Sequence, residues 1–299
     1  MFSVCCKERN FYLSGMMEPI IRIVQLSKSF GEKQVLKDIS LDIYPGQVIG
    51  YIGPNGAGKS TTVKILCGLL PDFEGSITVK GIDLRQEPME VKKLVGYVPE
   101  LADLYEVLTP VEFLELIAGL HQLEPAMAAD RIQKMLVAFG LGANLHQRMD
   151  TFSKGMRQKV LLISGLLHDP DIIILDEPLS GLDANSVIIV KELISQLAAQ
   201  GKTIFYCSHM MDVVEKVSDR IVLINDGRIL ADGSFEELQE SMGKSSLENI
   251  FAQLTSTGSL GEAATSLMAA FHSGNVASAV AAADAAADSP ASPVKADHE

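Results

Sequence analysis

The sequence predicts an α/β fold with a mostly parallel sheet and an inserted helical subdomain. Short apolar runs at residues 172–175, 203–207 and 221–224 alternate with helical stretches, as parallel strands buried on both faces do. Between about residues 88 and 167 the pattern changes to apolar residues at helical spacing, as at Val111, Leu114 and Ile117. The helical subdomain is therefore expected between the first strands and the last ones.

The segment before that subdomain predicts strands, a loop and a helix. Three β-branched runs, at residues 20–26, 35–43 and 48–52, are separated by turn residues and predict strands. The third run leads into glycine-rich sequence, and apolar residues then recur at helical spacing up to Pro71. Near the other end, Asn225, Asp226 and Gly227 predict a hairpin turn.

Composition suggests the domain boundaries and the compartment. We expect an N-terminal extension at 1–17, a folded domain at 18–243, a short helical extension at 244–256 and a disordered Ala/Ser-rich tail at 257–299. The net charge of −13 argues against nucleic acid as a partner. Four cysteines without CxxC spacing favour a reducing compartment over a zinc site or a disulfide scaffold. No apolar run approaches the roughly 20 residues of a spanning helix, so a cytoplasmic protein is expected.

Residues 53–60 match the G-x-x-x-x-G-K-[ST] phosphate-binding loop (P-loop, Walker A), between a predicted strand and a predicted helix. In such a loop backbone N–H groups surround the phosphates, the lysine amine reaches the β- and γ-phosphates, and the hydroxyl ligates Mg²⁺. The alternative is a chance glycine turn, which the flanking strand and helix disfavour. We therefore predict that ATP and Mg²⁺ bind here, with Ser60 on the metal, at Gly53, Pro54, Asn55, Gly56, Ala57, Gly58, Lys59, Ser60 and Thr61.

Asp176 and Glu177 end the apolar run at 172–175. Carboxylates in that position lie at the C-terminal edge of a parallel sheet, where α/β folds bind ligands. We expect Asp176 to hold the Mg²⁺ shell and Glu177 to accept the proton of the attacking water. An acidic helix cap is the alternative interpretation, and the phosphate loop weighs against it.

These motifs, together with residues 152–156, residues 180–183 and His209, resemble in kind and order the ATP-binding cassette (ABC) transporter ATPases over residues 20–241. The resemblance implies a P-loop NTPase core with an antiparallel β subdomain and the inserted helical subdomain. It implies a head-to-tail dimer with a second copy of the chain or a related ABC ATPase. Phe30 would stack on adenine, Asp183 would contact the partner and His209 would be a catalytic residue at the γ-phosphate. The signature segment would pack against the γ-phosphate held by the partner; it comprises Ser153, Lys154, Gly155 and Met156.

Two positions depart from the family pattern. Lys154 stands where the signature usually has glycine, and Glu100 stands where the family usually has glutamine. A carboxylate about 4 Å from a phosphate charge costs on the order of 4 kcal/mol per unit charge at an effective dielectric near 20. Glu100 is therefore expected either to ligate Mg²⁺ or to remain retracted from the phosphates.

The resemblance implies the energy-supplying subunit of a transporter, bound at the inner face of the cell membrane through a separate integral-membrane permease. Both departures and residues 245–254 resemble the branch that serves exporters of drugs, lipids, polysaccharides or ions, so export is the expected direction. A DNA-maintenance ATPase is one alternative, but it would need a long heptad insertion between Lys59 and Ser153. A translation-associated factor would normally carry two cassettes and a basic surface. Glu177 argues against a regulatory module that binds ATP without hydrolysing it.

Overall fold

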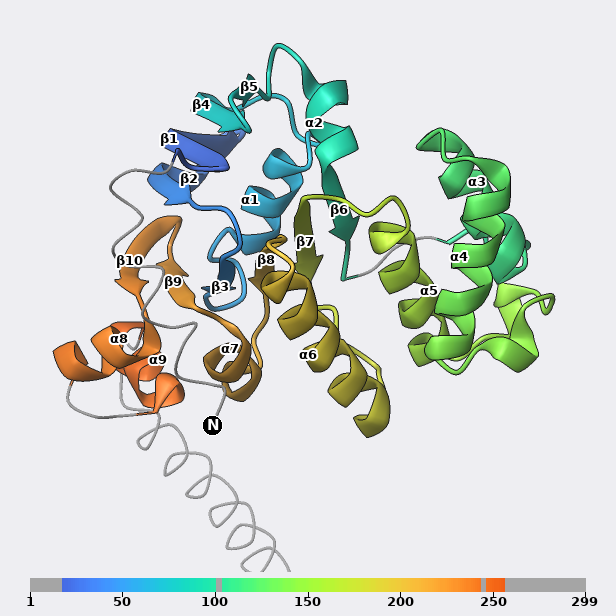
Figure 1. Cartoon of the computed structure of the whole chain (residues 1–299). Helices are drawn as coiled ribbons and strands as arrows, with labels where there is room; N and C mark the ends of the chain where they lie inside the picture. The colour runs from blue at the N-terminus through green and yellow to red at the C-terminus, as the bar shows by residue number, and fades with distance from the viewer. Residues whose placement is uncertain (1–17, 101–103, 243–245, 256–299) are drawn as a thin grey trace, which may run out of the picture. The chain divides into compact units, whose positions relative to one another are not determined.

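The computed structural model describes residues 18–100, 104–242 and 246–255 (Figure 1). The chain divides into two compact units, residues 1–251 and 252–299. Of the second unit only residues 252–255 are described, at the end of α9 (Leu247–Thr255). The extension predicted at 1–17 and the tail predicted at 257–299 lie outside the described residues, so the fold below is that of the first unit.

The core of the first unit is a six-stranded, mostly parallel sheet of order β10-β9-β3-β8-β7-β6 (Figure 1). Its parallel strands are β3 (Val48–Ile52), β6 (Val95–Val98), β7 (Ile172–Asp176), β8 (Thr203–Cys207) and β9 (Arg220–Asn225). β10 (Arg228–Gly233) pairs antiparallel with β9 through the predicted hairpin. Every residue of β3, β7 and β8 is buried, which explains their continuous apolar runs.

The second sheet is antiparallel, with the order β2-β1-β4-β5. It contains β1 (Ile21–Phe30), β2 (Lys33–Ile43), β4 (Glu74–Val79) and β5 (Ile82–Asp83). Sequence patterns did not locate β4 and β5, because the first half of β4 is exposed and β5 is only two residues long. Helix α1 (Lys59–Leu66) joins this sheet to the parallel one through a single apolar core that includes Ile23, Leu36, Val63, Ile65, Ile172 and Phe205.

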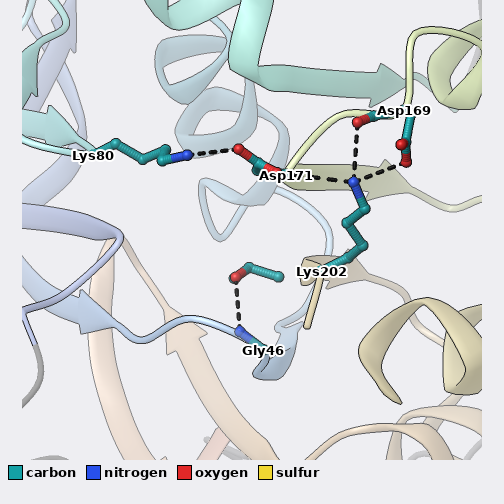
Figure 2. A network of polar contacts seen from close by, with 6 residues as sticks. Gly46, Lys80, Asp169, Asp171 and Lys202 are labelled. Atoms are coloured by element: carbon teal, nitrogen blue, oxygen red, sulfur yellow. Dashed lines mark hydrogen bonds and ion pairs between the residues drawn. The ribbon is translucent and has the colours of Figure 1, made fainter. Parts of the chain in front are cut away.

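A network of polar contacts lies at the N-terminal edge of β7, as Figure 2 shows, and its Lys80–Asp171 ion pair links the two sheets. The amine of Lys80, in the turn after β4, lies 2.6 Å from the carboxylate of Asp171. The amine of Lys202 lies 2.8 Å from the carboxylate of Asp169, and the Gly46 N–H donates to the Thr203 hydroxyl. Such partly exposed pairs each contribute about 1 kcal/mol or less. They fix the sheet edge opposite to the one that carries Asp176 and Glu177.

The helical subdomain contains α3 (Pro110–Leu120), α4 (Pro125–Ala138) and α5 (Lys154–Leu166). Its start was predicted near residue 88, where α2 (Pro88–Leu94) begins; α2 is followed by β6, a strand of the core sheet. Gly96 lets β6 approach α5 closely: a Cβ there would lie 2.0 Å from the Gly165 carbonyl oxygen. With this glycine and only four residues, β6 carries an apolar pattern too short to distinguish a strand from a helix.

The remaining helices follow the last strands: α6 (Ala184–Ala199), α7 (Met211–Val217) and α8 (Phe235–Met242). The extension predicted at 244–256 contains α9, from residue 247 to 255. Among the residues that the structure describes, no helix combines the length and the apolar character needed to cross a bilayer.

Candidate active site

A cavity of about 520 Å³ lies at the C-terminal edge of the parallel sheet. Its volume falls in the range of small-molecule sites, roughly 300–1,000 Å³. The sequence-predicted residues that line it are Asn55, Gly56, Gly58, Lys59, Ser60, Thr61, Glu100, Asp176, Glu177 and His209. Lys33 and Val35, from the start of β2, also line it, and sequence analysis missed both. The phosphate loop and the two carboxylates thus face one cavity, although more than 100 residues separate them in the sequence.

The phosphate loop owes its shape to glycines with positive φ, 82° at Gly56 and 109° at Gly58. A Cβ on Gly58 would lie 2.5 Å from a methyl carbon of Leu36, so the loop packs directly on β2. The Lys59 amine donates to the carbonyl oxygens of Gly53 (2.6 Å) and Pro54 (3.3 Å), which draws the loop around it. Helix α1 begins at Gly58 without a side-chain cap, so its first backbone N–H groups are suited to bind an anion.

Asp176 is buried at the end of β7, beside the phosphate loop. Burial raises the pKa of its carboxyl group, and the negative charges of Glu100 and Glu177 raise it further. A hydrogen bond from Ser60 and the charge of Lys59 act in the opposite direction. The Ser60 hydroxyl and the Asp176 carboxylate are hard oxygen ligands of the kind that Mg²⁺ prefers, and both line the cavity, so they fit the metal expected from the sequence.

Glu177 is held on both carboxylate oxygens. Its Oε1 lies 2.9 Å from Nδ1 of His209, and its Oε2 accepts a hydrogen bond of 3.1 Å from the Ser208 hydroxyl. Sequence analysis missed Ser208. The available signal was its place directly after β8, because Cys207 pairs with Asp176 across the parallel sheet. The carboxylate therefore has a fixed orientation toward the cavity, as a general base requires.

Other predicted residues lie outside the cavity lining. Phe30 is half-exposed, with the Lys28 amine 5.0 Å from the centre of its ring. Ser153 caps α5 and Asp183 caps α6, each by accepting a hydrogen bond from a backbone N–H group. The four residues of the signature segment do not line the cavity, and neither do Asp183, Gly53, Pro54 and Ala57. Their expected contacts with nucleotide or partner stay predictions.

Comparison with known proteins decides the family. The model of the ABC transporter family matches residues 36–180. The ABC transporter ATP-binding protein NatA of Bacillus subtilis is 38% identical over 237 residues, which cover 78% of this chain and 96% of NatA. The chain belongs to the ABC transporter ATP-binding proteins. This ABC protein is therefore an ATPase, the ATP-hydrolysing subunit of a transporter.

Two further relatives bear on the fold and on the role of this ABC protein. The linearmycin resistance ATP-binding protein LnrL of Bacillus subtilis is 35% identical, over 75% of this chain and 72% of LnrL. The dimeric structure of a bacterial ABC transporter cassette has a TM-score of 0.67 and 25% identity, covering 72% of this chain and 98% of that one. The predicted P-loop NTPase core of the ABC type, with its antiparallel and helical subdomains, is confirmed.

Proposed function

We propose that this ABC ATPase forms a head-to-tail dimer that drives solute export through a separate integral-membrane permease. The observation that carries the dimer is the position of the signature segment. Its Ser153 and Gly155 lie at the N-terminus of α5, which suits an anion, yet they do not line the cavity of their own phosphate loop. A nucleotide on a second subunit is the ligand that fits them. The solved structure of a dimeric ABC cassette supports the formation of a dimer.

Mg²⁺ is the proposed metal, held by Ser60, Asp176 and Glu100. Glu100 and Asp176 line the same cavity, and carboxylate oxygens are ligands that Mg²⁺ prefers. If Glu100 ligates the metal, its charge strengthens metal binding rather than repelling the phosphates. The departure from glutamine then has a function in this chain.

Glu100→Gln is therefore expected to raise the free Mg²⁺ needed for half-maximal turnover about tenfold, or about 1.4 kcal/mol. Titrating Mg²⁺ at saturating ATP measures the change. Glu87→Gln is the matched control, because Glu87 is exposed before α2 and does not line the cavity. An unchanged Mg²⁺ dependence in Glu100→Gln would mean that Glu100 stays retracted from the metal.

The proposed docking site for the permease is the exposed apolar surface of residues 104–120. Tyr105 and Val107 are 63% and 64% exposed, just after the segment that carries Glu100. On α3, Leu116 and Leu120 are 45% and 73% exposed and lie one helical turn apart on one face. Exposed apolar side chains of this kind mark contact surfaces. Because the docking surface follows Glu100 closely in the sequence and Glu100 lines the cavity, a change at the nucleotide can reach the permease through this part of the chain.

Purification of the tagged chain from a detergent extract of its own cells tests this proposal. A polytopic membrane protein should co-purify, and Tyr105→Ser with Leu120→Ser should reduce its recovery at least fivefold, or by about 1 kcal/mol. Val137→Ser on α4 is the control, since Val137 is also apolar and 56% exposed. Recovery of ribosomes or DNA in place of a membrane protein would exclude transport.

Export is the proposed direction because LnrL is named for resistance to linearmycin, and removal of a compound from the cell is one route to resistance. The same assembly places the ATPase at the inner face of the membrane, next to its permease. Neither NatA nor LnrL supports the DNA-maintenance or translation alternatives. Uptake of radiolabelled substrate by inverted vesicles, driven by ATP, measures the direction; accumulation in right-side-out vesicles would contradict export.

A further inference from the structure

The first turns of α5 pack against the turn formed by residues 177–183. The Lys154 amine donates a hydrogen bond of 2.9 Å to the Ser180 hydroxyl. The Lys154 side chain also covers Gly181, where a Cβ would lie 3.0 Å from its Cδ. A Cβ on Gly155 would lie 2.6 Å from the Gly181 carbonyl oxygen. The start of the signature helix is therefore in direct contact with the turn that carries Glu177.

Two more contacts from α5 reach the same turn. Gln158 is buried and donates to the Pro178 carbonyl oxygen at 3.3 Å. The Lys159 amine lies 3.3 Å from the carboxylate of Asp183, the residue that caps α6. Lys154 and Gln158 are four residues apart and share one face of the helix. Contacts from that face, together with the Lys159 ion pair, hold the turn from Pro178 to Asp183.

The turn itself needs such support. Glu177 has a φ of 50°, in the left-handed region that non-glycine residues rarely occupy. Conformations of this kind persist where the surrounding structure holds them. The Ser180 N–H donates to the Glu177 carbonyl oxygen at 3.1 Å, so Ser180 links Lys154 on one side to the backbone of Glu177 on the other.

We propose that Lys154 is a positioning residue that couples the signature segment to Glu177 of the same subunit, an inference that rests on the proposed dimer. When Ser153 and Gly155 meet the partner's nucleotide, α5 and the 177–183 turn move together. Contact of the signature segment with the partner's ATP thereby positions the Glu177 carboxylate, which acts on the ATP of its own subunit. The lysine that departs from the family pattern supplies the amine for this link.

A double-mutant cycle on kcat tests the link. Lys154→Ala and Ser180→Ala should each lower kcat about five- to tenfold, with an unchanged KM for Mg-ATP because the phosphate loop is intact. The double variant should be no slower than either single one, since both remove the same contact. Ser180→Thr keeps the hydroxyl and should recover most of the rate. Lys134→Ala, which removes an exposed lysine of α4, is the charge-matched control.

Other outcomes overturn the inference. If Lys154→Ala is slow but Ser180→Ala is not, the amine acts elsewhere, for instance directly on the partner's nucleotide. Additive losses, or native rates in both single variants, also refute the link. Should Lys154→Ala unfold, Lys154→Met keeps the packing over Gly181 and removes only the amine. If Glu177→Gln still turns over ATP, the proposed catalytic site and this inference are both rejected. If Glu177→Gln loses turnover but Lys154→Met has the native rate, only the inference is rejected.

Discussion

Lys59→Ala is expected to weaken ATP binding about 100- to 1,000-fold, or about 3–4 kcal/mol. The amine of Lys59 lies inside the phosphate loop, 2.6 Å from the Gly53 carbonyl oxygen, and it lines the cavity. It is the cation that the loop holds against the triphosphate, and its loss leaves those charges without their partner. Isothermal titration with Mg-ATP measures the change.

Two controls separate this effect from a general loss of charge or of stability. Lys64→Ala removes a lysine from the last turn of the same helix, away from the cavity, and should bind ATP as the native chain does. Lys33→Ala removes a second amine that lines the cavity, at the exposed start of β2. It should weaken ATP binding about tenfold at most. Native affinity in a folded Lys59→Ala would show that the loop is not the phosphate site.

The parts of this site that could be predicted from the sequence are those encoded locally. Residues 53–60 are contiguous, and Gly56 and Gly58 have the positive φ that favours glycine. Asp176 and Glu177 directly follow an apolar run that became a fully buried strand. In both places a few adjacent residues determine the backbone conformation and its chemistry, so the sequence motif alone is sufficient to predict the site.

The parts that were missed depend on tertiary packing. Lys33 and Val35 reach the cavity because β2, in the other sheet, packs on the phosphate loop through Leu36 and Gly58. Ser208 reaches Glu177 because β8 lies next to β7. Neither neighbour relation follows from periodicity, since strand order is not written in the apolar pattern. The four-residue strand β6 was missed for the same reason, as its place depends on a backbone contact between Gly96 and Gly165.

Glu177→Gln is expected to lower kcat at least 100-fold, within the roughly 10²- to 10⁴-fold range of general-base catalysis, and to leave Mg-ATP binding intact. The amide has the shape of the carboxylate, so its oxygen can still accept from Ser208 and its NH₂ can face His209. Only the proton acceptor is removed. Single-turnover release of phosphate measures the chemical step, and Glu192→Gln is the matched control, because Glu192 is an exposed residue of α6.

The same variant should accumulate as an ATP-bound dimer on size-exclusion chromatography with Mg²⁺. Glu100, Asp176 and Glu177 place three carboxyl groups around the cavity, and removing one charge reduces their repulsion of the γ-phosphate. In addition, hydrolysis no longer opens the dimer.

If turnover persists, the nearest other base is His209, with Nδ1 2.9 Å from Glu177. A larger loss in His209→Ala than in Glu177→Gln would then assign the base to the histidine, because a residue that only orients the carboxylate cannot matter more than the carboxylate itself.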